Sequence, residues 1–216
     1  MHVNIEGNTN KSHLIYNSEN SSVNVTETKE PIHLCDNTQV DMSTCKAICL
    51  TCMDFRTVDD TVYQLNKRLY LNNYDHVGLA GASLGYIRTL DNTNSTVMPV
   101  AIAGTNYEYW EQMFNDHIEL AGALHSISEV VIIDHMYCGA YKYSYPELLE
   151  NMGTYLEFNK HMENLYIAKE KILTKYDNQY TVRMFIIGID GCTFYELFDG
   201  DNIPKTENEF NLIFKI

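Results

Sequence analysis

The sequence has little positive charge for its size. It contains 15 Lys and Arg residues against 29 Asp and Glu residues, which gives a formal net charge of −14. Nucleic acids and anionic membranes attract an excess of Lys and Arg, so this balance disfavours both as the main partner. A small neutral or monoanionic substrate remains compatible, because the charges nearest to a site set its local field.

Long apolar runs and a secretion signal are also absent. No apolar run approaches the roughly 18 residues of a membrane-spanning helix, so we expect no membrane partner. The first residues lack a basic segment followed by an apolar one, which disfavours a secretory signal. We therefore expect a cytoplasmic protein, located in the host cytoplasm or the virion if the chain is viral. In that setting the six cysteines are expected to be thiols or metal ligands rather than disulfides.

Composition divides the chain into two parts. Residues 1–43 are rich in Asn, Ser and Thr, which predicts an N-terminal extension that is flexible or packs on a partner subunit. Residues 44–216 are predicted to form one folded domain. Hydrophobic residues make up 45% of the whole chain, which is enough to form a core.

Predicted strands alternate with predicted helices in this domain. Apolar runs predict strands at 46–54, 76–84, 129–134 and 182–190. Amphipathic patterns predict helices at 57–71, 109–127 and 155–176, and residues 88–99 are predicted to form a loop. The alternation predicts an α/β fold with a mainly parallel central sheet of about four core strands, flanked by helices. Sites in such sheets form beyond the carboxyl ends of the strands.

Two motifs overlap at the end of the first predicted strand, in ICLTCMDFR (48–56). Cys49 and Cys52 have the CxxC spacing of a redox pair or of half a zinc site. Side chains alternate between faces along a strand, so Cys49 would point into the core and away from Cys52. Cys52 and Asp54 would share one face, which favours the second motif, CxDxR, completed by Arg56.

Another motif follows the third predicted strand. His135 and Cys138 have HxxC spacing, and with Cys52 they offer two thiolates and one imidazole. Three protein ligands with an open fourth position are typical of catalytic zinc, whereas structural zinc usually has four. Arg56 could hold Asp54 ionised through a bidentate pair, so that the carboxylate orients a water molecule at the metal. Alternatively, these two residues form a plain surface ion pair.

The order C-x-D-x-R then H-x-x-C-G, each motif closing a strand, resembles the β-class carbonic anhydrase family. The likeness extends over residues from about 45 to 198, with CMDFR and DHMYCGA as the matching motifs. LAGASLG (79–85) stands where the family has an Ala-Gly segment that lines the site. IIGIDG (186–191) falls where the last strand of the family core would lie.

The resemblance implies one zinc ion per chain, held by Cys52, His135 and Cys138. It implies a lyase activity, the reversible hydration of CO2 to bicarbonate and a proton. Asp54 and Arg56 would form the catalytic dyad, with Asp54 either orienting water or itself capping the metal. The resemblance also implies a homodimer or a higher even oligomer, with the N-terminal extension packed across the partner.

Several positions depart from the usual family pattern and indicate a divergent branch. Phe55 occupies a position between Asp and Arg that is usually small. The substrate pocket is expected to include Phe55, Ala80, Gly81 and Gly139. Two alternatives to CO2 hydration stay open: hydrolysis of a small CO2 analogue, and a non-catalytic zinc-binding or assembly role.

Other histidines and the glycine-rich GLAGASLG are weaker candidates. A single histidine on a helix is more often a core or rim residue than a proton shuttle, and this applies to His117, His125 and His161. His76 opens the second predicted strand, at the end that should lie away from the site. GLAGASLG lacks the lysine and the glycine spacing of phosphate-binding loops.

Overall fold

A computed structural model of the 216-residue chain describes residues 14–17, 22–25, 44–87, 108–198 and 203–214. The chain falls into two compact units, residues 1–40 and 41–216. In the first unit, β1 (Leu14–Asn17) pairs antiparallel with β2 (Ser22–Val25). The predicted loop at 88–99 lies outside the described residues, and the role predicted for the N-terminal extension stays a prediction.

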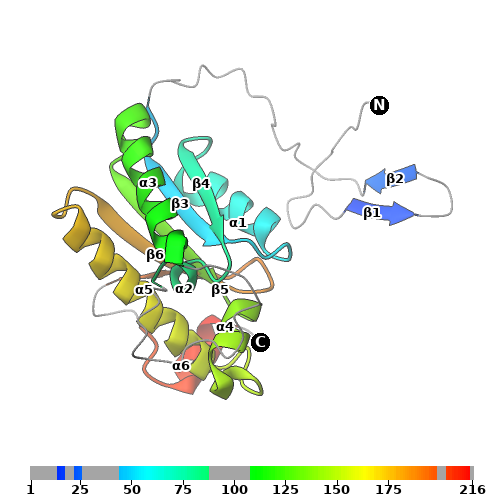
Figure 1. The fold of residues 1–216 in the computed structure, drawn as a ribbon. Helices are drawn as coiled ribbons and strands as arrows, with labels where there is room; N and C mark the ends of the chain where they lie inside the picture. Colours follow the sequence, from blue (N-terminus) through cyan, green and yellow to red (C-terminus); the bar gives the residue numbers. More distant parts are fainter. Residues whose placement is uncertain (1–13, 18–21, 26–43, 88–107, 199–202, 215–216) are drawn as a thin grey trace. The chain divides into compact units, whose positions relative to one another are not determined.

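The second unit is built on a five-stranded sheet in the order β4-β3-β5-β6-β7 (Figure 1). The first four of these strands are parallel: β4 (Tyr74–Leu79), β3 (Ala47–Cys52), β5 (Glu129–His135) and β6 (Thr181–Ile187). They are the strands that the apolar runs predict, and the predicted α/β class is confirmed. The edge strand β7 (Phe194–Leu197) runs antiparallel to β6 and was not predicted, because its four mostly half-buried residues form no apolar run.

Helices connect and cover the strands. They are α1 (Val58–Gln64) with its π-helical continuation η1 (Leu65–Leu69), α2 (Ser83–Ile87), α3 (Glu108–His125), α4 (Gly139–Ser144), the 3-10 helix η2 (Pro146–Leu148), α5 (Tyr155–Lys175) and α6 (Glu207–Ile213). The three predicted helices correspond to α1 with η1, α3 and α5. The short helices α2, α4 and α6 were missed, since a few residues cannot show a 3.6-residue period. Within the described ranges, no helix has both the length and the apolar character needed to span a membrane.

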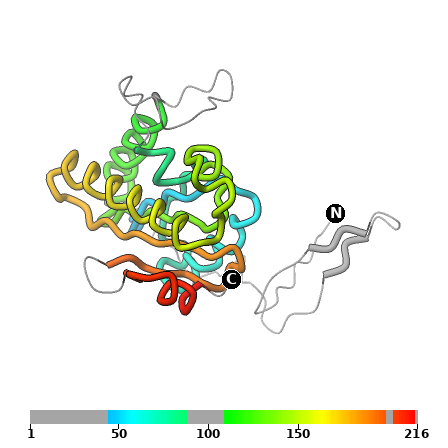
Figure 2. Tube along the Cα trace, turned by 90° about the horizontal axis from the view of Figure 1, so that it is seen from below, coloured from blue at the N-terminus to red at the C-terminus, as the bar shows by residue number. Residues whose placement is uncertain are grey.

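Alternation along the strands creates a core on each face of the sheet. Ile48, Leu50 and Cys52 pack with buried residues of α2, α3, α5 and α6. Cys49 belongs to the opposite core, where it packs with η1. Helices α3 and α5 lie side by side over the first face, joined by an ion pair of 2.8 Å between Glu111 and Lys171 (Figure 2). The alternation thus separates Cys49 from Cys52, as the sequence predicts.

Candidate metal centre

The three predicted metal ligands meet at the carboxyl edge of the sheet. Cys52 ends β3 and His135 ends β5, and these adjacent parallel strands pair with Thr51 opposite Ile133. Cys138 follows one turn later, where α4 begins. The ligand atoms of Cys52, His135 and Cys138 lie within 4.8 Å of one another, and all three residues are buried. This group could hold a metal ion.

His135 presents a nitrogen suited to a metal. Its Nδ1 atom lies 2.9 Å from the carbonyl oxygen of Met136, which can only accept, so Nδ1 carries the proton. The Nε2 atom then has a free lone pair; it is buried and has no hydrogen-bond partner among the described residues. A buried polar atom without a partner costs free energy, and coordination to a cation would remove that cost.

The two thiols also fit a soft or borderline cation. Cys52 Sγ and Cys138 Sγ are 4.0 Å apart, close to the roughly 3.8 Å between two sulfurs on one tetrahedral zinc ion. The hydrogen bond from Cys138 lowers the pKa of Cys52, whereas the proton held in that bond and burial raise the pKa of Cys138. The backbone N–H of Gly81 donates to Cys52 Sγ at 3.3 Å. Two thiolates can be present together here only with a cation between them.

Asp54 and Arg56 form the bidentate pair that the motif predicts. Arg56 Nε donates to Asp54 Oδ1 at 2.9 Å, and Nη2 donates to Oδ2 at 2.6 Å. These hydrogen bonds lower the pKa of Asp54 to about 2. Asp54 Oδ2 also lies 3.8 Å from His135 Nε2, so the carboxylate borders the ligand cluster. This position distinguishes the pair from an ordinary surface ion pair.

The turn between His135 and Cys138 is held from two sides. Tyr137 has a φ of 61°, a left-handed conformation that non-glycine residues rarely adopt. Its carbonyl oxygen accepts a hydrogen bond of 2.9 Å from Arg56 Nη2. Its ring packs closely against Gly153: a Cβ added at Gly153 would lie 2.2 Å from the Tyr137 ring. Contacts with Arg56 and with the start of α5 therefore stabilise the strained turn.

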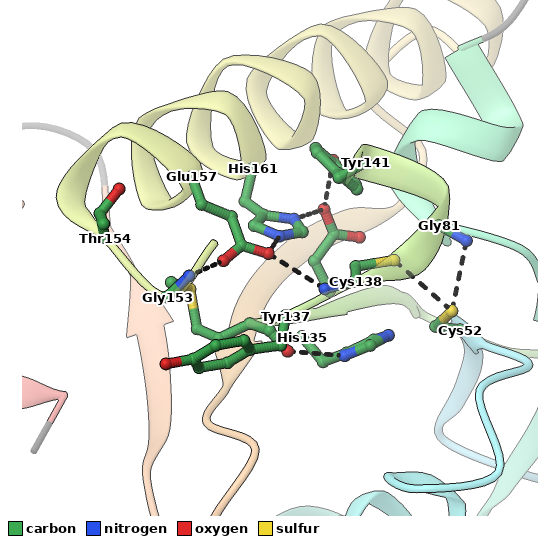
Figure 3. A network of polar contacts seen from close by, with 12 residues as sticks. Cys52, Gly81, His135, Tyr137, Cys138, Tyr141, Gly153, Thr154, Glu157 and His161 are labelled. Atoms are coloured by element: carbon green, nitrogen blue, oxygen red, sulfur yellow. Dashed lines mark hydrogen bonds and ion pairs between the residues drawn. The ribbon is translucent and has the colours of Figure 1, made fainter. Parts of the chain in front are cut away.

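A buried carboxylate of α5 supports the same turn (Figure 3). Glu157 accepts a hydrogen bond from the backbone N–H of Cys138 at 3.0 Å and another from Gly153 at 2.6 Å. Its Oε1 atom lies 3.5 Å from His161 Nε2, one helical turn further along α5. The side chains of Glu157 and His161 are both fully buried.

His161 links this carboxylate to a second one. Its Nδ1 atom lies 2.9 Å from Asp134 Oδ2, which also accepts hydrogen bonds of 2.6 Å from Tyr141 and Ser83. Sequence reasoning did not assign Asp134, Glu157 or His161 to the site. The available signal was polar residues at core-facing positions of a predicted strand and of a predicted amphipathic helix.

The expected pocket residues take different positions. Gly81 is buried beside Cys52 with a φ of 76°, and Ala80 and Gly139 are half-buried. Phe55 is 87% exposed, so in the single chain it does not enclose the metal cluster. The roles of these four residues in substrate binding stay predictions.

Comparisons with known proteins place the chain among uncharacterized relatives. No family model matches it. The uncharacterized protein RC0076 of Rickettsia conorii is 34% identical over 152 residues, which are 68% of this chain and 71% of the relative. An uncharacterized protein of Rickettsia bellii is 34% identical over 144 residues, 66% of this chain and 76% of that protein.

Solved structures with a similar fold include carbonic anhydrases. The carbonic anhydrase of Streptococcus mutans aligns with a TM-score of 0.45 at 14% identity, over 76% of this chain and 88% of that chain. One of two tetrameric β-carbonic anhydrases of Sordaria macrospora aligns with a TM-score of 0.44 at 14% identity, over 74% and 83%. On its sequence identity and coverage, the chain belongs to the same family as the uncharacterized protein RC0076 of Rickettsia conorii.

Proposed function

We propose that this protein is a zinc-dependent lyase that catalyses the reversible hydration of CO2 to bicarbonate and a proton. One observation carries the proposal: the buried cluster of Cys52, His135 and Cys138 adjoins an ion-paired carboxylate. Either feature alone is common in proteins. Together they combine a three-ligand metal site with a fixed hydrogen-bond acceptor that can orient water at the metal.

The metal ligands would be the two thiolates and His135 Nε2. A donor set of sulfur and nitrogen atoms favours zinc over magnesium or calcium. When bound, zinc supplies Lewis-acid activation of water near neutral pH. The chain itself keeps the ring of His135 in one tautomer through Met136, and it stabilises the charge on Cys52 through the N–H of Gly81.

Asp54 orients the attacking water in this proposal. Its lowered pKa keeps it ionised at neutral pH, so it accepts a hydrogen bond from water and cannot act as the acid. Arg56 occupies both carboxylate oxygens and thereby fixes their direction. The contact of 3.8 Å with His135 Nε2 also puts Asp54 within a small movement of the metal position. We propose that the same carboxylate caps the metal in an inactive form.

The substrate is proposed to be CO2, a small neutral molecule that needs no charged binding group. A related alternative is the hydrolysis of a small CO2 analogue, because Phe55 departs from the small residue that the β-class carbonic anhydrase pattern has at this position. We also propose a cytoplasmic homodimer or higher even oligomer, in which a partner subunit covers the exposed apolar side chains next to the dyad, Met53 and Phe55.

Stopped-flow measurement of CO2 hydration on zinc-quantified protein tests the proposal. The wild-type chain should hydrate CO2, and Cys138→Ser should lose both turnover and one zinc per chain. Cys49→Ala removes a buried thiol from the opposite core and is the matched control, which should keep its zinc and its turnover. Zinc at this cluster without CO2 turnover would contradict the anhydrase proposal. Turnover of a carbon–sulfur analogue by that same protein would instead favour the alternative.

A further inference from the structure

A second group of metal-binding side chains lies at the opposite edge of the sheet. Cys45 precedes β3, Asp75 is the second residue of β4, and His125 is the last residue of α3. The ligand atoms of these three residues also lie within 4.8 Å of one another. Six residues of extended chain lie between Cys45 and Cys52, so the two clusters are about 20 Å apart.

Backbone hydrogen bonds hold the three residues together. The N–H of Cys45 donates to the carbonyl oxygen of His125 at 2.9 Å, which joins the end of α3 to the start of β3. The neighbouring N–H of Lys46 donates to the carbonyl oxygen of Asn73 at 3.1 Å, which joins the same segment to the start of β4. The cluster is therefore positioned by the main chain of three elements.

The order of contacts distinguishes the cluster from a catalytic triad. Asp75 Oδ2 lies between the other two groups, 2.8 Å from His125 Nδ1 and 3.5 Å from Cys45 Sγ. In a nucleophilic site the histidine contacts the thiol and activates it. Here a carboxylate contacts the thiol, and this negative neighbour opposes formation of a thiolate. A cation bound among the three groups would let the thiolate and the carboxylate coexist.

The cluster is accessible from solvent. The side chains of His125 and Asp75 are 38% and 32% exposed. A cavity of about 210 Å³ is lined by Asp75, His117 and His125 together with apolar residues of α3. Nδ1 of His117 donates to the carbonyl oxygen of Met113 at 2.7 Å, so the lone pair of its neutral ring is on Nε2. The cavity leaves room for an entering ion and its remaining water ligands.

We propose that Cys45, Asp75 and His125 form a second zinc site, half-buried and distinct from the fully buried cluster at the other edge. One thiolate, one imidazole and one carboxylate are a donor set that zinc accepts. Binding would replace the hydrogen bonds within the cluster by bonds to the ion, release the thiol proton to solvent and transfer the Nδ1 proton of His125 to its Nε2 through solvent. The ion would clamp the end of α3 to the starts of β3 and β4. The proposal does not depend on the reaction at the buried site.

Zinc stoichiometry measured on the full chain tests the proposed second zinc site. Reduced protein is dialysed first against a micromolar excess of Zn²⁺. It is then dialysed against the same buffer in which the free zinc concentration is held constant, and the zinc bound per chain is quantified. The wild-type chain should hold two ions, while Cys45→Ser and His125→Gln should each hold one. Cys192→Ser, which removes an exposed thiol elsewhere, should hold two. Equal zinc content in Cys45→Ser and Cys192→Ser would overturn the proposal.

Cobalt substitution gives an independent readout. Three of the ligands across both sites are thiolates, so Cys45→Ser should remove about one third of the cobalt–thiolate charge-transfer absorption. An unchanged band in Cys45→Ser would overturn the proposal. Cys138→Ser distinguishes the proposed lyase site from the proposed second zinc site. If this variant keeps the full wild-type zinc content, the lyase site is contradicted and the second-site proposal is unaffected.

Discussion

His135 illustrates how one side chain can carry chemical information that a motif does not. The HxxC spacing names a histidine and a cysteine, but it does not say which ring nitrogen faces the metal. The carbonyl oxygen of Met136 accepts a hydrogen bond from one ring nitrogen, which therefore carries the proton. The other nitrogen is buried without a hydrogen-bond partner in the described part of the chain. This unpaired nitrogen of His135 points to coordination more directly than the motif does.

Arg56 is expected to matter for orientation rather than for charge. Arg56→Gln removes the bidentate pair with Asp54 and the hydrogen bond to the carbonyl of Tyr137. Misplacement of a catalytic group by about 1 Å costs roughly 100-fold in rate, and we expect a loss of that order in CO2 hydration. Zinc content should stay at the wild-type level. Arg56→Lys keeps the charge without the fork geometry, so a full recovery of rate in that variant would contradict an orienting role.

Helix α5 contributes to the site without touching the metal position. Its first turns bring Glu157 and His161 under the turn that carries Cys138, and both side chains are fully buried. An imidazolium between two buried carboxylates is stabilised only while all three groups keep their partners. The element therefore couples the stability of the fold to the geometry of one ligand.

Glu157→Gln should destabilise the zinc-loaded protein. The amide keeps the shape of the side chain but removes its negative charge. The buried His161 then contacts one carboxylate, that of Asp134, instead of two. Breaking a buried charged pair costs about 3 kcal/mol, and urea unfolding would measure that loss. The control is Glu163→Gln, an exposed glutamate of the same helix, which should change stability by less than about 0.5 kcal/mol. Equal effects of both variants would rule out the buried network as the cause.

The same network predicts a dependence of stability on pH. Burial alone would lower the pKa of His161, but its hydrogen bond to Asp134, its ion-pair contact with Glu157 and the charges of both carboxylates raise it to about 9. Tyr141 also packs against this ring. The pKa is raised above the unfolded value of about 6.5, so the stabilisation is complete below pH ~6.5 and is lost as the pH rises through about 9.

Urea unfolding of wild-type and His161→Gln protein at several pH values measures this contribution. The difference in free energy of unfolding should be largest near pH ~6 and should decline towards pH ~9.5. Groups outside this network titrate equally in both proteins, so their effects cancel in the difference. A difference that stays constant across this range would show that the imidazole is neutral in the folded state.

The second unit presents two chemically different edges of one sheet. The carboxyl edge carries the buried Cys52–His135–Cys138 cluster, and the amino edge carries the half-buried group at Cys45. Parallel strands make this possible, because every strand sends its start to one edge and its end to the other. The net charge of −14 favours retention of cations at both edges.

Assembly is the prediction that concerns the molecule as a whole. We expect a dimer or a higher even oligomer by light scattering, because Met53 and Phe55 leave apolar surface next to the dyad. Phe55→Ser should weaken the assembly, measured as an increase in monomer on dilution. Leu212→Ser, which removes an apolar side chain that is 80% exposed on α6, should leave it unchanged. A monomeric wild-type protein would contradict the prediction.

Local patterns in the amino-acid sequence were sufficient for the four parallel strands, the long helices and the grouping of Cys52, His135 and Cys138. These features depend on periodicity and on strand ends, which neighbouring residues determine. Alternation of side chains was also enough to separate Cys49 from Cys52. The short antiparallel strand β7 was not predicted, because its pairing depends on a partner strand rather than on its own residues.

Contacts between distant segments determine the features that local sequence patterns did not predict. Glu157 meets Cys138 across 19 residues, His161 meets Asp134 across 27, and His125 meets Asp75 across 50. No local pattern encodes such pairings, because each exists only after helices have packed on the sheet and expelled water. The proximity of Cys52, His135 and Cys138 could therefore be predicted from the motifs, whereas the buried support of this cluster and the second cluster required the folded chain.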